Sequence, residues 1–489
     1  MLTIPISQDN KVPMYEQIYD YIKKEILSGH LKAGEKLPST RQLSGHLCVS
    51  RNTIDMAYDQ LISEGYIDSY PKRGYYVNDI HWSMEAPLHR ILPTEQSANG
   101  VKSIKQPTKA TYSGNLTAGN PTASNRYTYD FSPFAIDLEH FPYHTWQKLL
   151  KTSLKERQDL FLLGPNQGDL SFRKALQTYL RRSRGVLCEP EQIIIGAGAD
   201  YLLQLLCQIF EKDSIIALEN PTYMRAYRIF QGFSYKTVPI DLDDSGISVS
   251  ELVTKRAKIA YVTPSHQYPL GIIMPIKRRK ELLSWANEST DRYIIEDDHD
   301  SEFRFKGKPI PSLQSIDPLG RVIYMGTFSR SIAPAIRIAY MVLPTALLQK
   351  YQQLLPHYSS TVSRIDQAIM TEFLTEGYFE RHLNRMRTLY KTKHDVMLSA
   401  LRQFGKHITL LGEQAGLHLA VRFHVSIDES TILSLAFNEG IRLYPLSKHL
   451  IGPMNESHPC FLMGFGSLNE EQIQEGMEKL YLILKPYFL

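Results

Sequence analysis

With 489 residues the chain is too long for one ordinary domain, and its 43% hydrophobic content is enough for a sizeable core. A formal net charge of only +4 excludes a chain-wide surface for polyanions, so any contact with nucleic acid must be local. No two of the 4 cysteines form a C-x-x-C pair, which argues against a zinc knuckle or a disulfide framework. The chain begins without the basic and apolar segments of a signal peptide, and it has no run of about eighteen apolar residues. We therefore expect a cytoplasmic protein without a membrane span.

Residues 12–78 carry the pattern of three short helices followed by a hairpin. After Pro13, apolar residues recur at helical spacing, as Ile18, Ile22, Ile26 and Leu27 do. Ser39 and Ser50 stand where the second and third helices would need an N-cap. Residues 66–70 and 75–77 then flank the turn Pro71-Lys72-Arg73-Gly74, which predicts a hairpin with a basic tip. Three helices and a hairpin predict a winged helix-turn-helix domain of the α+β class.

Residues 79–126 are rich in Ser, Thr, Asn, Gly and Lys and poor in large apolar residues, which predicts a flexible linker. A linker of this length does not require the flanking domains to touch within one chain. From residue 127 to residue 489, amphipathic helices alternate with apolar runs, among them 193–198, 214–219, 259–264, 293–297 and 322–328. This alternation predicts a large α/β domain with a mostly parallel sheet covered on both faces. The C-terminal part of this region has the pattern of a smaller α+β lobe.

Residues 37–67 read LPSTRQLSGHLCVSRNTIDMAYDQLISEGYI, with Pro-Ser-x-Arg before the second helix and Ser-Arg-x-Thr before the third. Together with the basic wing, this pattern resembles the GntR family of DNA-binding regulators. The resemblance implies that the first turn of the third helix meets double-stranded DNA, where its free N–H groups and dipole favour a phosphate. Arg51 is long and forked enough for bidentate contact with a guanine. The expected DNA-binding residues are Ser39, Arg41, Ser50, Arg51, Asn52, Thr53, Lys72, Arg73 and Gly74.

Each of these residues taken alone is equally an ordinary helix cap or a solvated charge. Residues 1–80 also carry similar numbers of acidic and basic side chains, so gross electrostatics do not support binding. The joint pattern therefore carries the prediction of DNA binding.

The large domain contains four ordered segments: ENPTYMRAY (219–227), TPSHQYPLG (263–271), YIIEDDHDSEF (293–303) and YMGTFSRSIAPAIRIAYMVLP (324–344). Their order and spacing resemble fold-type I aminotransferases. With the winged helix, the chain outside the linker resembles the MocR/GabR subfamily of GntR-type regulators. This resemblance implies a head-to-tail homodimer, in which each winged helix lies over the partner's large domain.

The same resemblance implies a pyridoxal 5'-phosphate site. Asp297 would pair with the pyridinium nitrogen and Tyr223 would stack on the ring. The phosphate would be held at a helix start and by nearby side chains, from Gly198, Ala199, Asp200, Thr327, Ser329 and Arg337. Arg225 corresponds to a position that can hold the carboxylate of an effector in the GABA-responsive relative.

Four residues depart from the family's pattern. Arg330 stands at the position of the lysine that forms the Schiff base, and a guanidinium is almost never a nucleophile, so a covalent aldimine is not expected. His299 replaces a tyrosine that bonds the phenolic oxygen of the cofactor, and Asp200 adds a negative charge to the phosphate turn. Ser467 replaces a carboxylate-binding arginine. An engineered lysine-to-arginine change would give the same sequence at position 330. Non-covalent cofactor binding, another small-molecule ligand and a vestigial pocket all stay open.

Three other features have ordinary interpretations. Neighbours along a strand point to opposite faces, so the acidic run around Asp297 and His299 is not expected to bind a metal. His266 is expected as a wall of the pocket rather than a catalytic base. The basic run at 277–280 is expected to be a solvated helix face.

Three functions are consistent with these patterns. The first is a transcription regulator whose aminotransferase-like domain senses an amino acid or a pyridoxal-phosphate-related molecule without turnover. The second is an aminotransferase with an accessory DNA-binding domain, which Arg330 disfavours because transamination needs a lysine. The third is a regulator whose large domain only dimerises. We expect the first and do not expect an enzyme.

Overall fold

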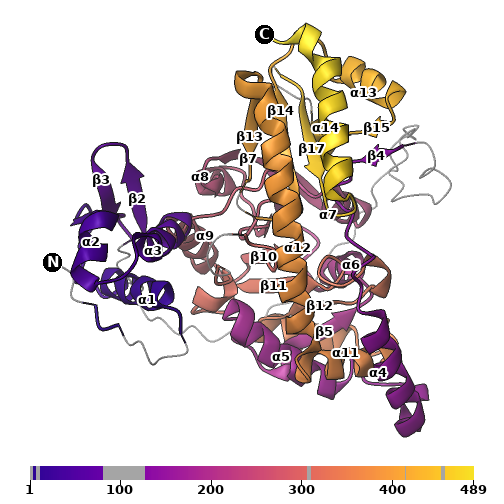
Figure 1. Ribbon diagram of the computed structural model, residues 1–489. Coiled ribbons are helices and arrows are strands. Elements are labelled where there is room, and N and C mark those ends of the chain that lie inside the picture. Colours follow the sequence, from indigo (N-terminus) through magenta and orange to yellow (C-terminus); the bar gives the residue numbers. More distant parts are fainter. Residues whose placement is uncertain (1–3, 7–11, 81–126, 306–309, 414, 453–457) are drawn as a thin grey trace.

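The computed structural model describes residues 4–6, 12–80, 127–305, 310–413, 415–452 and 458–489. A small N-terminal domain lies at the left of Figure 1, beside a much larger domain. Most of the predicted linker, residues 81–126, falls outside the described residues. Across the parts of the chain that are described, no helix is both long and apolar enough to cross a membrane.

The N-terminal domain has the predicted winged-helix elements. Its helices are α1 (Met14–Leu27), α2 (Thr40–Leu47) and α3 (Arg51–Ser63), and its strands are β1 (Lys36–Leu37), β2 (Ile67–Tyr70) and β3 (Gly74–Val77). The strands pair antiparallel in the order β1-β3-β2. The strand β1 was not predicted, because a strand of two residues leaves no pattern in the sequence. Ile18, Ile22 and Ile26 are fully buried, as expected. Leu27 is not: it is 51% exposed, because it lies about 100° round the helix from Ile26.

The large domain is built on an eight-stranded sheet in the order β5-β12-β11-β10-β9-β6-β7-β8. Its strands are β5 (Ile193–Gly196), β6 (Ile215–Asn220), β7 (Lys236–Asp243), β8 (Gly246–Ile247), β9 (Ile259–Val262), β10 (Tyr293–Asp298), β11 (Val322–Thr327) and β12 (Ala339–Val342). The neighbours from β11 to β7 pair parallel, whereas β12 runs antiparallel to both β11 and β5. All five predicted apolar runs are strands of this sheet.

Helices cover the sheet on both faces, and several of them follow the strands in chain order (Figure 1). They are α4 (Tyr143–Glu156), α5 (Leu170–Arg184), α6 (Ala199–Ile209), α7 (Met224–Gly232), α8 (Val249–Thr254), α9 (Ile276–Asn287), α10 (Thr345–Leu354) and α11 (Arg364–Thr375). The strands β5, β9, β10 and β12 are buried along their whole length, which accounts for the continuous apolar sequences of β5, β9 and β12.

The C-terminal lobe is α+β, as predicted. The long helix α12 (Tyr378–Leu401) leads from the large sheet to a four-stranded antiparallel sheet in the order β13-β14-β17-β16. These strands are Ile408–Leu411, His418–Phe423, Cys460–Gly464 and Tyr444–Pro445, and the lobe also contains α13 (Glu429–Asn438), β15 (Ile441–Arg442) and α14 (Glu470–Leu484). The short strand β4 (Tyr129–Asp130) pairs with β15, so the first residues of the large domain are hydrogen-bonded to its C-terminal lobe.

The two domains touch within the chain, through helix α9. Ile276, the first residue of α9, belongs to the hydrophobic core of the winged helix, and its N–H donates to the Glu64 carbonyl at 2.9 Å. The Lys280 Nζ donates to the Ile80 carbonyl at 2.8 Å. The basic run at 277–280 is therefore not simply a solvated face. Arg279 in particular is buried, and its guanidinium donates to three backbone carbonyls, those of Met274, Pro311 and Pro264.

Candidate functional site

Helix α3 presents its N-terminal turn at the surface of the winged helix. Ser50 is its N-cap, since the Ser50 Oγ accepts from the Thr53 N–H at 3.1 Å and lies 2.8 Å from the Thr53 Oγ1. Arg51 and Asn52 are exposed. The Arg51 Nε lies 3.7 Å from the Asp55 Oδ2, an exposed pair that contributes little in water. Ser50 and Thr53 thus shape the turn, while Arg51 and Asn52 point their polar groups to solvent.

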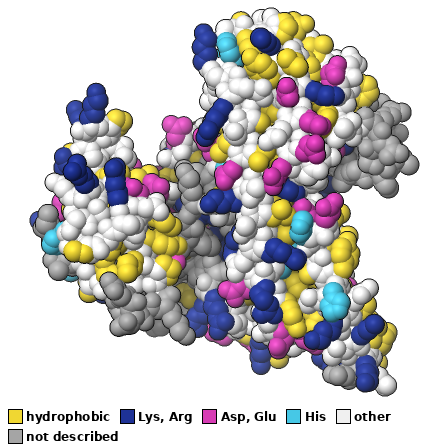
Figure 2. Space-filling view, in the orientation of Figure 1, with side chains coloured by type: hydrophobic (Ala, Val, Ile, Leu, Met, Phe, Trp, Pro, Cys, Tyr) yellow, Lys and Arg dark blue, Asp and Glu magenta, His cyan; other side chains and the backbone are white. Residues whose placement is uncertain are grey.

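The other predicted DNA contacts lie at the start of α2 and in the wing. Ser39 caps α2 in a capping box with Gln42, and Arg41 in the first turn is exposed. In the wing, Lys72 and Gly74 adopt positive φ of 64° and 104°, which turns the chain between β2 and β3. Figure 2 shows basic side chains at this tip, at the upper left of the molecule. The structure thus places all three basic elements on the small domain at its surface.

The phosphate turn predicted for the large domain lies between β5 and α6. Gly198 is the N-cap of α6 with φ of 92°, and a Cβ there would lie 2.1 Å from the Arg337 Nη2. The Arg337 Nη2 in turn donates to the Ala197 carbonyl at 3.3 Å. A glycine is therefore favoured at position 198, because other residues rarely adopt this backbone conformation. Ala199 is the first residue of the helix.

Asp200 lies between the two arginines that were predicted as ligand contacts. Its Oδ2 is 3.5 Å from the Arg225 Nη1 and 3.8 Å from the Arg337 Nη2. The carboxylate was expected to oppose a phosphate at this turn. It also forms ion pairs with two guanidinium groups near the turn, those of Arg225 and Arg337.

Asp297 and Tyr223 lie together on the carboxyl side of the sheet. Asp297 is near the end of β10 and is buried, and the Tyr261 hydroxyl donates to its Oδ2. Burial raises the pKa of Asp297 to about 6, although the hydrogen bond from Tyr261 acts in the opposite direction. Burial also raises the pKa of Tyr223 to about 12, with the nearby charges of Asp200 and Asp297 adding to the effect. The two residues predicted to bind a pyridine ring are thus near enough for their charges to interact, and their role in binding stays a prediction.

Thr327, Ser329 and Arg330 follow β11. The Thr327 Oγ1 donates to the Ser329 Oγ at 2.9 Å and accepts from the Ser329 N–H at 3.1 Å, so the two hydroxyl groups hold one another. Arg330 is buried; its Nη2 donates to the Pro133 carbonyl at 2.5 Å, and its guanidinium lies 5.5 Å from the centre of the Phe134 ring. The Nη1 of Arg330 has no hydrogen-bond partner within the described residues.

His299 lies in a group with Asp300 and His266. The His266 Nδ1 is 3.1 Å from both Asp300 oxygens, and the His299 Nε2 is 3.2 Å from the Asp300 Oδ1. Burial acts to raise the pKa of Asp300, but the nearby His266 and His299 lower it far below its ordinary value. Burial lowers the pKa of His299 to about 4. His266 thus contacts the Asp300 carboxylate, and its role as a wall of the pocket stays a prediction.

Sequence reasoning missed several residues that shape these sites. Tyr261 reaches Asp297 from the neighbouring strand, and its only signal was an apolar run. Tyr268 lies at the centre of a ring cluster, 6.0 Å from Tyr223 and 5.6 Å from His299 and His418. His418 comes from the C-terminal lobe, which no motif linked to the site. Ser467, which the sequence singled out, is exposed.

Comparison with known proteins gives two family matches. The family described as bacterial regulatory proteins, gntR family, matches residues 14–77. The family described as aminotransferase class I and II matches residues 124–480. Among solved structures, the kynurenine aminotransferase of Pyrococcus horikoshii, in complex with PMP, matches with a TM-score of 0.66 and 25% identity. That match covers 76% of this chain and 95% of the aminotransferase.

Two curated relatives match over both domains. The uncharacterized HTH-type transcriptional regulator YdeL of Bacillus subtilis is 38% identical, with 96% of each chain covered. The probable rhizopine catabolism regulatory protein MocR of Rhizobium meliloti is 32% identical, with 97% of this chain and 94% of that protein covered. The chain therefore belongs to the MocR-type transcriptional regulators, in which a GntR winged helix is joined to a class I and II aminotransferase domain.

Proposed function

We propose that this cytoplasmic regulator binds an operator in double-stranded DNA and that its aminotransferase-like domain senses a small molecule without turnover. One observation carries the proposal: a winged helix with exposed Arg51 and Asn52 is joined to an aminotransferase-type domain in which residue 330 is an arginine. Ligand binding would then shift the large domain between states and change how the winged helix is presented to DNA.

Pyridoxal 5'-phosphate fits this pocket only in part. Asp297, Tyr223 and the Gly198 turn offer groups for a pyridine ring and a phosphate. Arg330 supplies no amine, and its guanidinium is held by the Pro133 carbonyl and the Phe134 ring. A covalent bond to the cofactor therefore does not fit, and no chemical step follows from it. We propose a non-covalent ligand, either an amino acid held by Arg225 or a molecule related to pyridoxal phosphate.

Titration of the purified chain with pyridoxal phosphate tests this proposal, with absorbance and thermal melting followed together. We expect a rise in Tm without a visible imine band. An imine band would favour the aminotransferase alternative, because it would mean that another amine replaces the missing lysine. No rise in Tm with pyridoxal phosphate or with any amino acid would favour a large domain that only dimerises.

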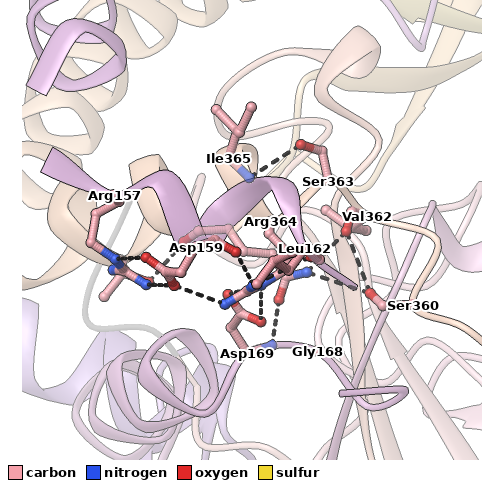
Figure 3. A network of polar contacts seen from close by, with 12 residues as sticks. Arg157, Asp159, Leu162, Gly168, Asp169, Ser360, Val362, Ser363, Arg364 and Ile365 are labelled. Atoms are coloured by element: carbon pink, nitrogen blue, oxygen red, sulfur yellow. Dashed lines mark hydrogen bonds and ion pairs between the residues drawn. The ribbon is translucent and has the colours of Figure 1, made fainter. Parts of the chain in front are cut away.

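We propose further that the regulator is a homodimer. Three consecutive apolar side chains, Phe161, Leu162 and Leu163, are exposed at the end of α4, and Leu163 is 93% exposed. Figure 3 shows how the backbone of this loop is held: Arg364 contacts Asp159 and Asp169 and donates to the Leu162 carbonyl at 3.3 Å. A rigid apolar tip of this kind is typical of a surface that a second subunit covers.

Light scattering of the eluting protein tests the dimer. Leu163→Asp should yield monomers at a concentration where the wild type is dimeric, because it places a charge in the covered surface. Val253→Asp on α8, another exposed apolar position, is the control and should leave the mass unchanged. In a head-to-tail dimer, α9 of one subunit would make the contact with the winged helix of the other subunit. An unchanged mass for Leu163→Asp would place the interface elsewhere.

A further inference from the structure

Three potential metal ligands meet beyond the ends of two neighbouring strands. His299 and Asp300 directly follow β10, and His266 lies in the loop after β9. These strands are adjacent and parallel, so their carboxyl ends open on the same edge of the sheet. Strand alternation, which argued against a metal site in the acidic run, does not apply to residues beyond the strand. The third residue comes from another segment, which no pattern in the acidic run could indicate.

The spacing of the ligand atoms suits a small metal ion. One nitrogen or oxygen from each residue lies within 4.8 Å of the other two. The Asp300 Oδ1 is 3.1 Å from the His266 Nδ1 and 3.2 Å from the His299 Nε2. A tetrahedral ion with bonds of about 2.0 Å separates its ligand atoms by about 3.3 Å. Two edges of the group therefore already have nearly the length that coordination requires.

Hydrogen bonds satisfy only some of the polar atoms of these three side chains. Asp300 accepts from His266, but the His299 Nε2 is badly aligned for a hydrogen bond with the same carboxylate. Within the described residues the His299 Nε2 has no other hydrogen-bond partner, and the same holds for the His266 Nε2. His266 and Asp300 are almost fully buried. Buried polar atoms without partners are uncommon, and an ion bound by the His299 Nε2 would explain this one.

The charges near the group also permit a cation. Arg330 adds one positive charge that acts on His299 and Asp300. Asp300 and Asp297 add two carboxylates, and the charges of these two act on one another. The local balance is therefore negative before an ion enters, which partly offsets the charge of a divalent ion.

We propose that His266, His299 and Asp300 bind one divalent transition-metal ion, of the kind represented by Zn²⁺. Two imidazoles and one carboxylate form a ligand set that zinc accepts. His299 is the most exposed of the three side chains, so the remaining coordination position opens on its side, toward the pocket. Binding through the His266 Nδ1 replaces the hydrogen bond between this atom and Asp300, and the proton of the imidazole then lies on the Nε2. The site does not depend on DNA binding or on a sensed organic ligand.

The test uses the full chain, freed of metal by chelation, in calorimetric titration with Zn²⁺ and in absorbance titration with Co²⁺. We expect one ion per chain and visible cobalt bands that Zn²⁺ removes. His299→Ala and His266→Ala should each weaken binding about 100-fold or more, because each removes one of three ligands. His299→Gln serves as a second variant, and circular dichroism checks that each variant is folded.

A second imidazole pair on the protein provides the matched control. The rings of His424 and His458 lie 4.9 Å apart in the C-terminal lobe, far along the chain from the proposed ligands. His424→Ala should leave the affinity for Zn²⁺ unchanged. The proposal is overturned if the wild type takes up no ion, or if folded His299 variants bind as tightly as the wild type. It is equally overturned if His424→Ala, or Cys48→Ser at the exposed cysteine, abolishes the signal.

Discussion

The contact between the winged helix and α9 makes a quantitative prediction through Ile276. This side chain belongs to the large domain by sequence, yet it is only 7% exposed and packs in the hydrophobic core of the winged helix. Ile276→Ala removes three carbon atoms from that core. At about 0.8 kcal/mol per buried carbon, docking of the winged helix should weaken by about 2 kcal/mol, or about 30-fold in the docked population.

Hydrogen exchange is the appropriate assay, because the Ile276 N–H donates to the Glu64 carbonyl across the contact. In Ile276→Ala, amides of α1, α3 and the start of α9 should exchange faster, while those of the central sheet should not. Leu482→Ala is the control, since Leu482 lies on α14 and is 59% exposed. Unchanged exchange in both variants would refute the docking that the structure shows. A change that depends on protein concentration would mean that the contact joins two subunits.

Three other predictions concern the two sites and pH. Arg51→Ala should weaken binding to the cognate DNA by about 1 to 3 kcal/mol. Lys72→Ala should weaken binding to all sequences and lower the slope of log affinity against log salt concentration by about one unit. Equal salt slopes for the two variants would contradict this difference. Arg330→Lys should give a visible imine band with pyridoxal phosphate that the wild type lacks; absence of the band would mean that other residues also prevent the bond. Burial raises the pKa of Glu219 from 4.5 to about 7, so the folded protein holds this proton more tightly than the unfolded chain does. The wild type should therefore lose stability relative to Glu219→Gln as the pH rises from about 4.5 to 7, by about 3 kcal/mol in total, as urea melts at several pH values would report; parallel pH profiles would contradict the burial argument.

The fold was largely predictable because its signals are local. Helix caps such as Ser39 and Ser50, and buried strands such as 193–196 and 293–298, leave patterns that neighbouring residues in the sequence reveal. The strand β12 escaped prediction because it pairs antiparallel with β5, which is distant in sequence. The docking of α9 was missed for the same reason. A run of four basic residues looks solvated until the carbonyls that accept from Arg279 are known.

The candidate site was predictable where one residue type has one chemical role. Arg330 shows this most clearly, because a guanidinium excludes an imine whatever surrounds it. The partners of a side chain were not predictable. Sequence placed Asp200 at the turn but could not show that it contacts Arg225 and Arg337. The approach of His266 to Asp300 likewise depends on how two loops bend after their strands.

The ion pairs of Asp200 have a consequence for the concentrations to which such a pocket responds. A phosphate or carboxylate that enters the turn must displace an anion that the chain itself supplies, tethered in place and present at all times. Asp200, Arg225 and Arg337 are each partly exposed, so the competing pairs are worth at most about 1 kcal/mol, or about fivefold in affinity. The Asp200 carboxylate is thus a weak internal competitor for any anion that binds to Arg225 and Arg337. For the ligand proposed above, this competition would raise the concentration needed for half-saturation by at most about fivefold.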